Sequence, residues 1–292
     1  MRRGRVGALL LLGVLAVGLP GAMKSFIWEI GEGKNTGFVL GSIHLLKKEM
    51  YPLSPAIEAA FAASDVLVLE VDLSGDRMNR LSLQLMGRGM YQDDRTLKDE
   101  LSESAYTRVK TQLQERYGID IALYHQFKPW FLALTVESIE LLRMGFDPKY
   151  GVDMVFLRRA EGKKDILGLE TAEFQMELFQ SLSGTEGETF LLHTLEEVDR
   201  EKQHLDEIVE SWLRGDAVRI EEILNEVVTD QPDLRALNRR LLDDRNLSMA
   251  DKIAGFLETG RRHFVVVGAA HLVGPKGIIR LLSGRGIRVR QL

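Results

Sequence analysis

The sequence predicts an α/β fold, with a central mixed sheet that takes strands from both ends of the chain and carries large helical insertions. Apolar runs too short for helices occur near the amino terminus, at residues 36–42 and 65–72, and near the carboxyl terminus, at residues 263–271. Between them, long stretches show apolar residues at spacings of three and four, which indicates helices. Short continuous apolar runs are typical of strands covered on both faces, so we expect helices on both sides of the sheet.

The amino-terminal part of the sheet is predicted from three segments and a helix. Residues 25–30 and 36–42 flank a Gly/Asn turn and are predicted to form a β-hairpin. A serine followed by a proline then marks the start of a helix over residues 54–64. Four consecutive apolar residues within 65–72 predict a buried strand, because the run is too short for a helix.

Two large helical insertions are predicted at about residues 76–160 and 171–257, separated by a short apolar strand at 163–170. Sequence repeats, low-complexity tracts and Pro/Ser-rich linkers are absent from the sequence. We therefore expect residues 23–292 to form a single domain. The alternative is an α/β domain with a separate helical domain.

The last elements are predicted from the carboxyl-terminal segments. Residues 263–271 contain the most hydrophobic strand of the chain, and residues 272–286 are predicted to form a helix with a glycine-rich end. Residues 287–292 alternate arginines with apolar residues, a pattern that indicates an edge strand.

Composition excludes several classes of function. The formal net charge is -5, with 43 acidic and 38 basic residues and no dense Lys/Arg block after the first residues, so we expect no nucleic-acid partner. The chain has no cysteine, which excludes disulfides, thiolate metal sites and a cysteine nucleophile. Any chemistry must come from histidines, carboxylates, hydroxyls or a bound metal ion.

The first 22 residues have the plan of a secretory signal peptide: three arginines, an apolar core, and then proline and small residues. An uncleaved membrane anchor and a true start at Met23 are the alternatives, and the anchor would associate the protein with a membrane. An acidic exported domain without cysteine indicates the periplasm or cell envelope of a bacterium.

Four predicted strands end in side chains that can do chemistry. Ligand sites in open α/β sheets form beyond the carboxyl ends of the strands, where loops diverge, so we expect these side chains to share one pocket. They are His44, Glu70 with Asp72, Glu170, and His271.

Each of these residues also has an ordinary structural interpretation. A histidine after a strand is more often a hydrogen-bonded loop residue than a ligand, and a glutamate before a helix suits the helix dipole. Two Gly-x-x-His tetrapeptides at opposite ends of the chain, 41–44 and 268–271, favour a site instead. Gly41 and Gly268 are expected there because a side chain would crowd a bound ion or substrate.

Two imidazoles with one or two carboxylates suit a divalent metal ion, for which Mn, Co, Zn and Fe are candidates. A remaining carboxylate could take a proton from metal-bound water. The chain contains no His-Glu-x-x-His motif, so a zincin-type site is excluded.

Residues 241–257 predict a helix whose start carries Arg245 and Asn246. In the structural interpretation, Asn246 or Ser248 is the N-cap and Arg245 forms a surface ion pair. In the functional one, Arg245 reaches the pocket to bind a carboxylate or stabilise an oxyanion, with Asn246 beside it. Asp153 is expected to cap a helix and is a further candidate for the pocket.

Motifs along nearly the whole chain after the leader resemble the TraB/GumN family, which is similar to the Tiki metalloproteases and the pheromone-shutdown protein PrgY. The resemblance implies a fold similar to that of the erythromycin-esterase and ChaN-like proteins. Tiki-like members are divalent-metal-dependent peptidases, which implies Mn or Co as cofactor. The motifs are FIWEIGEGKNTGFVLGSIHLL, LVLEVD, KPWF, GVDMVFLRRAEGKKDILGLETAEFQ, DDRNLSMADKI and FVVVGAAHLVGPKGIIRLL.

The resemblance also implies which residues form the site, since each family motif has a matching position in this chain. These positions are His44, His271, Glu70, Glu170 and Arg245, with Gly41 and Gly268 as the motif glycines.

We therefore predict an exported metal-dependent hydrolase that cleaves peptide bonds in a peptide or protein substrate. His44 and His271 are expected to bind the ion with one glutamate, while the other glutamate acts as general base and Arg245 anchors or polarises the substrate. The roles of the glutamates stay open, with Glu170 preferred as the ligand. One alternative is a non-catalytic protein that sequesters a peptide or haem in the same pocket, and another is an envelope-assembly protein whose pocket is vestigial.

Overall fold

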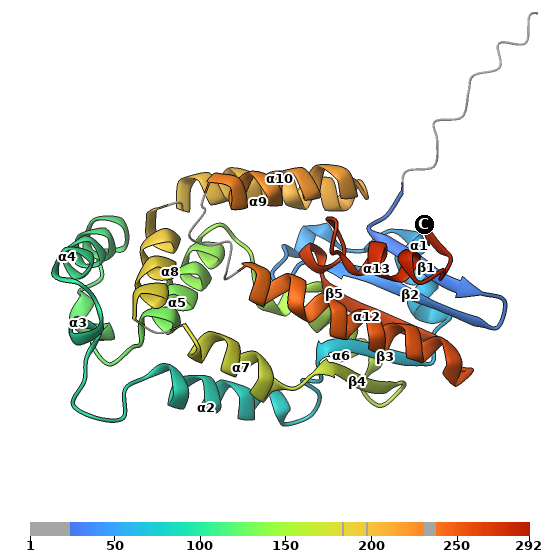
Figure 1. The fold of residues 1–292 in the computed structure, drawn as a ribbon, viewed down its shortest axis with the longest axis horizontal. Coiled ribbons are helices and arrows are strands. Elements are labelled where there is room, and N and C mark those ends of the chain that lie inside the picture. The colour runs from blue at the N-terminus through green and yellow to red at the C-terminus, as the bar shows by residue number, and fades with distance from the viewer. Residues whose placement is uncertain (1–23, 183, 197, 231–237) are drawn as a thin grey trace, which may run out of the picture.

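The computed structural model describes residues 24–182, 184–196, 198–230 and 238–292. The predicted signal peptide or anchor at residues 1–22 lies outside the described residues. A six-stranded sheet with helices packed on it forms one end of the molecule, and a helical layer extends from it (Figure 1). The predicted α/β fold class, with strands from both ends of the chain, is confirmed.

The sheet contains four parallel strands and an antiparallel extension. Its strands are β1 (Ile27–Glu32), β2 (Asn35–Ser42), β3 (Val66–Val71), β4 (Asp165–Glu170), β5 (His263–Gly268) and β6 (Val289–Gln291). Their order is β4-β3-β5-β2-β1-β6. β2, β5, β3 and β4 pair in parallel, whereas β1 runs antiparallel to both β2 and β6. The predicted mixed sheet, the amino-terminal hairpin and the edge strand near the carboxyl terminus are therefore correct.

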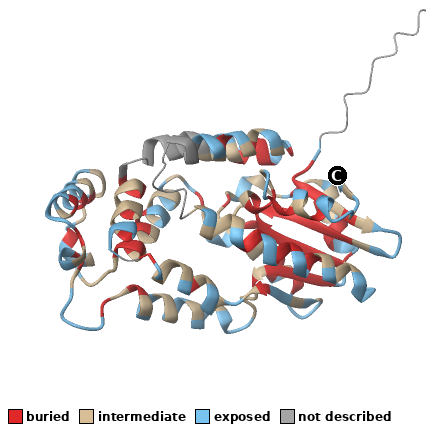
Figure 2. Ribbon diagram, viewed as in Figure 1, coloured by how far each residue is buried: buried red, intermediate tan, exposed pale blue. Residues whose placement is uncertain are grey.

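The parallel strands position the site because their carboxyl ends lie at the same edge of the sheet. β3 and β5 are central and almost completely buried, as their uninterrupted apolar runs predict (Figure 2). β4 is an outer strand that is exposed at its start and middle, while Leu169 and Glu170 at its carboxyl end are covered.

Helices fill the connections between the strands. α1 (Pro55–Ala62) joins β2 to β3, and α13 (Ile278–Gly284) precedes β6. Between β3 and β4 lie α2 (Arg77–Gly89), α3 (Leu97–Glu100), α4 (Glu103–Gln112), α5 (Pro129–Arg143) and α6 (Val152–Ala160). Between β4 and β5 lie α7 (Ala172–Gln180), α8 (Thr185–Glu196), α9 (Val198–Leu213), α10 (Ala217–Asp230) and α12 (Asp244–Phe256). These positions match the two helical regions expected from the apolar spacing, while the number of domains stays a prediction.

The main hydrophobic core surrounds the sheet. On one face the rings of Phe61 from α1 and Phe156 from α6 meet Phe264 of β5, with centroids 4.8 to 5.3 Å apart. α12 and α13 lie in front of the sheet in Figure 1 and contact each other. A separate apolar cluster joins α3, α4, α5 and α8 in the helical layer. The sheet is thus held rigidly between helices, which suits it as the base of a site.

Two local predictions differ in outcome. Ser54 caps α1 as expected, since its hydroxyl accepts a hydrogen bond from the N–H of Ile57. The helix predicted at 272–286 begins later, at Ile278, because the preceding residues form a 3-10 turn and a loop that carry His271. None of the helices in the described part of the chain has the length and apolar content that crossing a membrane requires.

Candidate functional site

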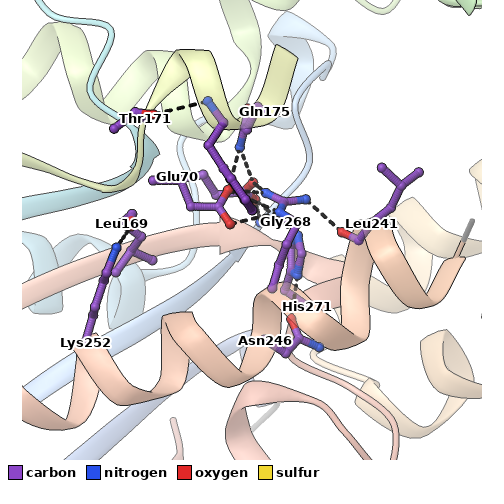
Figure 3. A network of polar contacts seen from close by, with 12 residues as sticks. Glu70, Leu169, Thr171, Gln175, Leu241, Asn246, Lys252, Gly268 and His271 are labelled. Atoms are coloured by element: carbon purple, nitrogen blue, oxygen red, sulfur yellow. Dashed lines mark hydrogen bonds and ion pairs between the residues drawn. The ribbon is translucent and has the colours of Figure 1, made fainter. Parts of the chain in front are cut away.

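Arg245 joins two glutamates that come from neighbouring strands. Figure 3 shows Glu70, Gln175, Gly268 and His271 in this network. Its Nε and Nη2 atoms donate to Glu170, at 2.7 to 3.1 Å, and Nη2 also donates to Oε2 of Glu70 at 2.7 Å. The remaining nitrogen, Nη1, donates to the carbonyl of Leu241 at 2.8 Å. The Gln175 amide from α7 donates to the same two carboxylates, at 3.2 Å to Glu70 and 3.0 Å to Glu170. All three charged side chains are at most 13% exposed, so these bonds hold both carboxylates in place.

Glu70 is ionised in this environment. Burial raises the pKa of its carboxyl group, but the surrounding cations and the N–H of Gly268, which donates to Oε1 at 2.7 Å, outweigh burial and lower the pKa to about 2. Burial likewise opposes the charge of Arg245, yet the two glutamates raise the pKa of its guanidinium above the ordinary value. Glu70 and Arg245 therefore keep their charges at neutral pH.

His271 is buried between Glu70 and Asn246. Its Nδ1 lies 2.6 Å from Oδ1 of Asn246, and its Nε2 lies 3.8 Å from Oε1 of Glu70. Its side chain is 4% exposed, and burial lowers the pKa of the imidazole to about 4 despite the adjacent carboxylate. His271 is therefore neutral at pH 7, and as a cation at lower pH it is the main group that lowers the pKa of Glu70. At neutral pH, His44 and Arg245 favour the ionised form of Glu70.

His44 follows the end of β2 and lies in a different environment. Its Nδ1 is 3.4 Å from Oδ2 of Asp153, whose other oxygen accepts a hydrogen bond from the Ser42 hydroxyl at 3.2 Å. Burial disfavours the imidazolium, but Asp153 and Glu70 outweigh it and raise the pKa of His44 to about 9. Solvent reaches 56% of the side chain, so water screens these charges.

The two motif glycines have different functions. A Cβ on Gly268 would lie 3.3 Å from Oε1 of Glu70 and 3.5 Å from Nε2 of His44, so this glycine keeps the centre open, as expected. A Cβ on Gly41 would lie 2.3 Å from the ring of Phe26 and does not face the centre. The expectation for Gly41 is wrong, because Gly41 is a residue of β2 that packs against the core.

Of the two aspartates among the candidates, Asp153 belongs to the site and Asp72 does not. Asp153 does not cap α6, since Gly151 holds that position, and it contacts His44 instead. Asp72 lies apart: one oxygen accepts from the N–H of Ser74 and the other is 3.3 Å from Arg77.

α12 begins at Asp244, as the sequence predicts, but neither Asn246 nor Ser248 is its N-cap. A π-helical turn, Arg239–Asp243, leads directly into α12, so Arg245 and Asn246 are buried residues inside a continuous helix. The structural interpretations of these two residues, as surface ion pair and N-cap, are thereby excluded. π-helical turns often occur at functional sites, where they change the direction in which side chains point.

A cavity of about 440 Å³ adjoins the cluster at Glu170. Its walls come from α2, from the segment after β3 and from the start of α7. They include Val71, Asp72, Leu73, Arg77, Leu81, Gln84, Glu170 and Glu173.

Gln175 is a site residue that no pattern in the sequence marks. It lies five residues after Glu170, on the first helix after β4, and a glutamine within a helix carries no chemical signal by itself. Its contact with Glu70, 105 positions earlier, depends on the sheet order.

Histidines and carboxylates are suitable ligands for a divalent metal ion, but their side chains are not arranged here in the geometry of a metal site. Among the described residues, no group of three or more histidine or acidic side chains converges closely enough to hold an ion. The imidazoles direct Nδ1 to Asn246 and Asp153, which leaves Nε2 of each ring toward the centre beside Gly268. The 3.8 Å between Nε2 of His271 and Oε1 of Glu70 is close to the roughly 3.4 Å that separates ligands in a tetrahedral site with bonds of about 2.1 Å.

Comparison with known proteins gives a consistent family assignment. The family model for the TraB/PrgY/gumN family matches residues 26–291. Two curated relatives carry the description "Uncharacterized protein YbaP". The protein from Shigella flexneri is 24% identical over 251 residues, which cover 86% of this chain and 89% of the relative. The protein from Escherichia coli (strain K12) is 24% identical over 245 residues, which cover 84% and 86%. No solved structure matches significantly.

Proposed function

The chain belongs to the TraB/PrgY/gumN family, and on that premise we propose that it is a divalent-metal-dependent hydrolase that cleaves peptide bonds. The observation that carries the proposal is the orientation of the two imidazoles. Each has Nδ1 engaged by a neighbouring side chain and turns Nε2 toward the same region in front of Gly268, where Glu70 also ends. Histidines oriented through Nδ1 by a neighbouring acceptor are typical of metal sites.

We assign the ion to His44, His271 and Glu70, with Mn or Co preferred and Zn or Fe as alternatives. Glu70 takes the place preferred for Glu170 in the sequence, because Oε1 of Glu70 lies 3.8 Å from Nε2 of His271, while Glu170 is bonded through both oxygens to Arg245. A bound divalent ion supplies an activated water, whose pKa falls to about 7 in good zinc sites.

Arg245 acts on the carboxylates rather than on the substrate. Each of its three nitrogens donates to an acceptor within the protein, so the guanidinium orients Glu70 and holds Glu170 in place. When His44 releases its proton to bind an ion through Nε2, Arg245 is left as the positive charge facing Glu70, Glu170 and Asp153, which favours a cation at the centre.

The cavity next to Glu170 supports a peptide as the substrate. Its volume of about 440 Å³ lies in the range of small-ligand pockets and is sufficient for peptide side chains beside the reacting bond. If peptides bind there, Gln84→Trp fills part of the cavity and raises KM more than it lowers kcat. An unchanged KM would place the substrate elsewhere.

The activity test uses purified protein that has been stripped of metal with a chelator. Mn, Co and Zn are added separately, and peptide libraries are analysed for cleavage by mass spectrometry. We expect cleavage that depends on one of these ions and disappears in Glu70→Gln. The matched control is Asp165→Asn, which removes a carboxylate at the opposite end of β4, where it pairs with Arg261.

Two outcomes contradict the proposal. If no ion stimulates cleavage but peptides bind tightly, the chain is a sequestering protein. If cleavage occurs and Glu70→Gln leaves it unchanged, the reaction takes place at another site.

We also propose that the protein is exported to the periplasm or cell envelope of a bacterium, on the basis of residues 1–22. Amino-terminal sequencing of protein isolated from cells should then begin near Met23. An intact leader on soluble cytoplasmic protein would exclude export.

A further inference from the structure

We propose that Asn246 is a positioning residue that fixes the tautomer of His271, with the proton on Nδ1 and the lone pair of Nε2 directed at Glu70. The consequence for metal binding rests on the function proposed above, whereas the tautomer itself does not.

The direction of the hydrogen bond follows from the second contact of Asn246. Its Nδ2 lies 3.0 Å from the backbone carbonyl of Lys276, and a carbonyl can only accept, so this end of the amide is the donor. The other end, Oδ1, can only accept, and it faces Nδ1 of His271 at 2.6 Å. Nδ1 must therefore carry the proton, which leaves Nε2 of the neutral ring unprotonated.

Without Asn246, the opposite tautomer would be favoured. Nε2 of His271 lies 3.8 Å from Oε1 of Glu70, an ionised carboxylate and a strong acceptor. A proton on Nε2 would be attracted to it, and the lone pair would then point away from the centre. Asn246 prevents this by offering a shorter and nearly solvent-free bond on the other nitrogen, since it is only 2% exposed.

Asn246 is itself held in one orientation. It lies in the first turn of α12, next to Arg245, so the helix that orients Glu70 also orients His271. Lys276 belongs to the loop that follows His271, so the amide connects the histidine, its own loop and α12. A rotation of the amide would bring two carbonyl oxygens together at Lys276, which is unfavourable.

The first test measures the tautomer in the metal-free full chain. Nitrogen-15 NMR at pH 8 distinguishes protonated from unprotonated ring nitrogens of each histidine. We expect Nδ1–H for His271 in the natural protein and a shift of the population toward Nε2–H in Asn246→Leu. Asn246→Asp keeps an acceptor for Nδ1 and should retain the Nδ1–H form. The matched control is Asn225→Leu, the same change on α10 beside the small cavity that Asn246 also lines, because Nδ1 of His271 is bonded by Asn246 and not by Asn225.

The second test measures the affinity for Mn, Co and Zn by calorimetry, with melting curves to confirm that each variant is folded. We expect a 10- to 100-fold loss for Asn246→Leu, the range seen when residues that orient metal ligands are replaced, and no comparable loss for Asn225→Leu. Asn246→Asp should retain most of the affinity.

The tautomer proposal is overturned if His271 keeps Nδ1–H in Asn246→Leu, or if it carries the proton on Nε2 in the natural protein. If the NMR result is as expected but the natural protein binds none of the three ions, the positioning role stands and the proposed metal-dependent function fails.

Discussion

The two Gly-x-x-His segments share a sequence pattern but differ in their physical setting. His271 is 4% exposed and neutral, and it contacts an amide, whereas His44 is 56% exposed and lies beside the carboxylate of Asp153. Burial lowers the pKa of His271 to about 4, while nearby carboxylates raise that of His44 to about 9. The same motif thus places two imidazoles at one centre. We call the rigid surroundings of His271 the buried half of this centre and the solvent-accessible surroundings of His44 its exposed half.

Because of this difference, the surroundings of the two histidines should respond differently to the same change. In the buried half, each polar group is matched to a partner, so removal of one partner leaves another unsatisfied. In the exposed half, water can replace a missing partner. The largest effects on stability are therefore expected around His271, Glu70 and Arg245.

The largest expected effect comes from breaking the buried half at Arg245. Arg245→Leu leaves Glu70 and Glu170 buried without their cation, and loss of one member of a buried ion pair costs about 3–5 kcal/mol of unfolding free energy. The measurement is chemical denaturation. Arg239→Leu is the control, because its side chain is 65% exposed and should change stability by no more than about 0.5 kcal/mol. Equal losses of unfolding free energy in Arg245→Leu and Arg239→Leu would contradict the special sensitivity of the buried half.

The next-largest effect is a different response of the two motif glycines to replacement by alanine. Gly41→Ala pushes a methyl group against Phe26 and should lower the unfolding free energy by about 1–3 kcal/mol, with metal affinity retained. Gly268→Ala places the methyl group among Glu70 and the imidazoles and should reduce metal affinity more than stability. Calorimetry with Mn or Co and denaturation of both variants check this. The assignment of different roles to the two glycines fails if both variants lose the same amounts of stability and metal affinity.

The histidines themselves should differ in their contribution to stability. His271→Ala removes the donor from Oδ1 of Asn246 in a buried environment, which costs about 1–3 kcal/mol. His44→Ala leaves Asp153 accessible to water and should change the unfolding free energy by at most about 0.5 kcal/mol. Both variants should lose metal affinity. Denaturation in chelator isolates the stability effect, and a larger loss for His44→Ala would reverse the assignment of the buried half.

The smallest effect is the opposite pH dependence of the two histidines in the metal-free protein. Because the pKa of His44 is raised from 6.5 to about 9, its contribution to the free energy of unfolding is complete below pH 6.5 and is lost as pH rises through 9. It should stay below about 1 kcal/mol, because the pair is screened by water. The pKa of His271 is lowered to about 4, so its burial costs stability as pH falls from 6.5 toward 4. Histidine NMR titration checks both directions, and similar midpoints for the two rings would refute the difference.

Much of the fold could be predicted because the signals are local. The uninterrupted apolar runs of β3 and β5 predict buried strands, and both are buried. The Ser54–Pro55 pair predicts the start of α1 from capping chemistry alone. The start of α12 at Asp244 is predicted as well, whereas the π-helical turn before it has no distinct sequence signal.

The sequence alone determined which residues at the strand ends can do chemistry. It did so because parallel strands place their carboxyl ends at one edge, and because His44, Glu70, Glu170 and His271 follow or end apolar runs. Only the tertiary structure decided their partners: that Arg245 bonds both glutamates, that Glu70 lies next to His271, and that Gly41 packs on Phe26. The physical reason is that partners such as Glu70 and Arg245 are 175 positions apart. Their contact depends on strand order and side-chain direction, which no local pattern encodes.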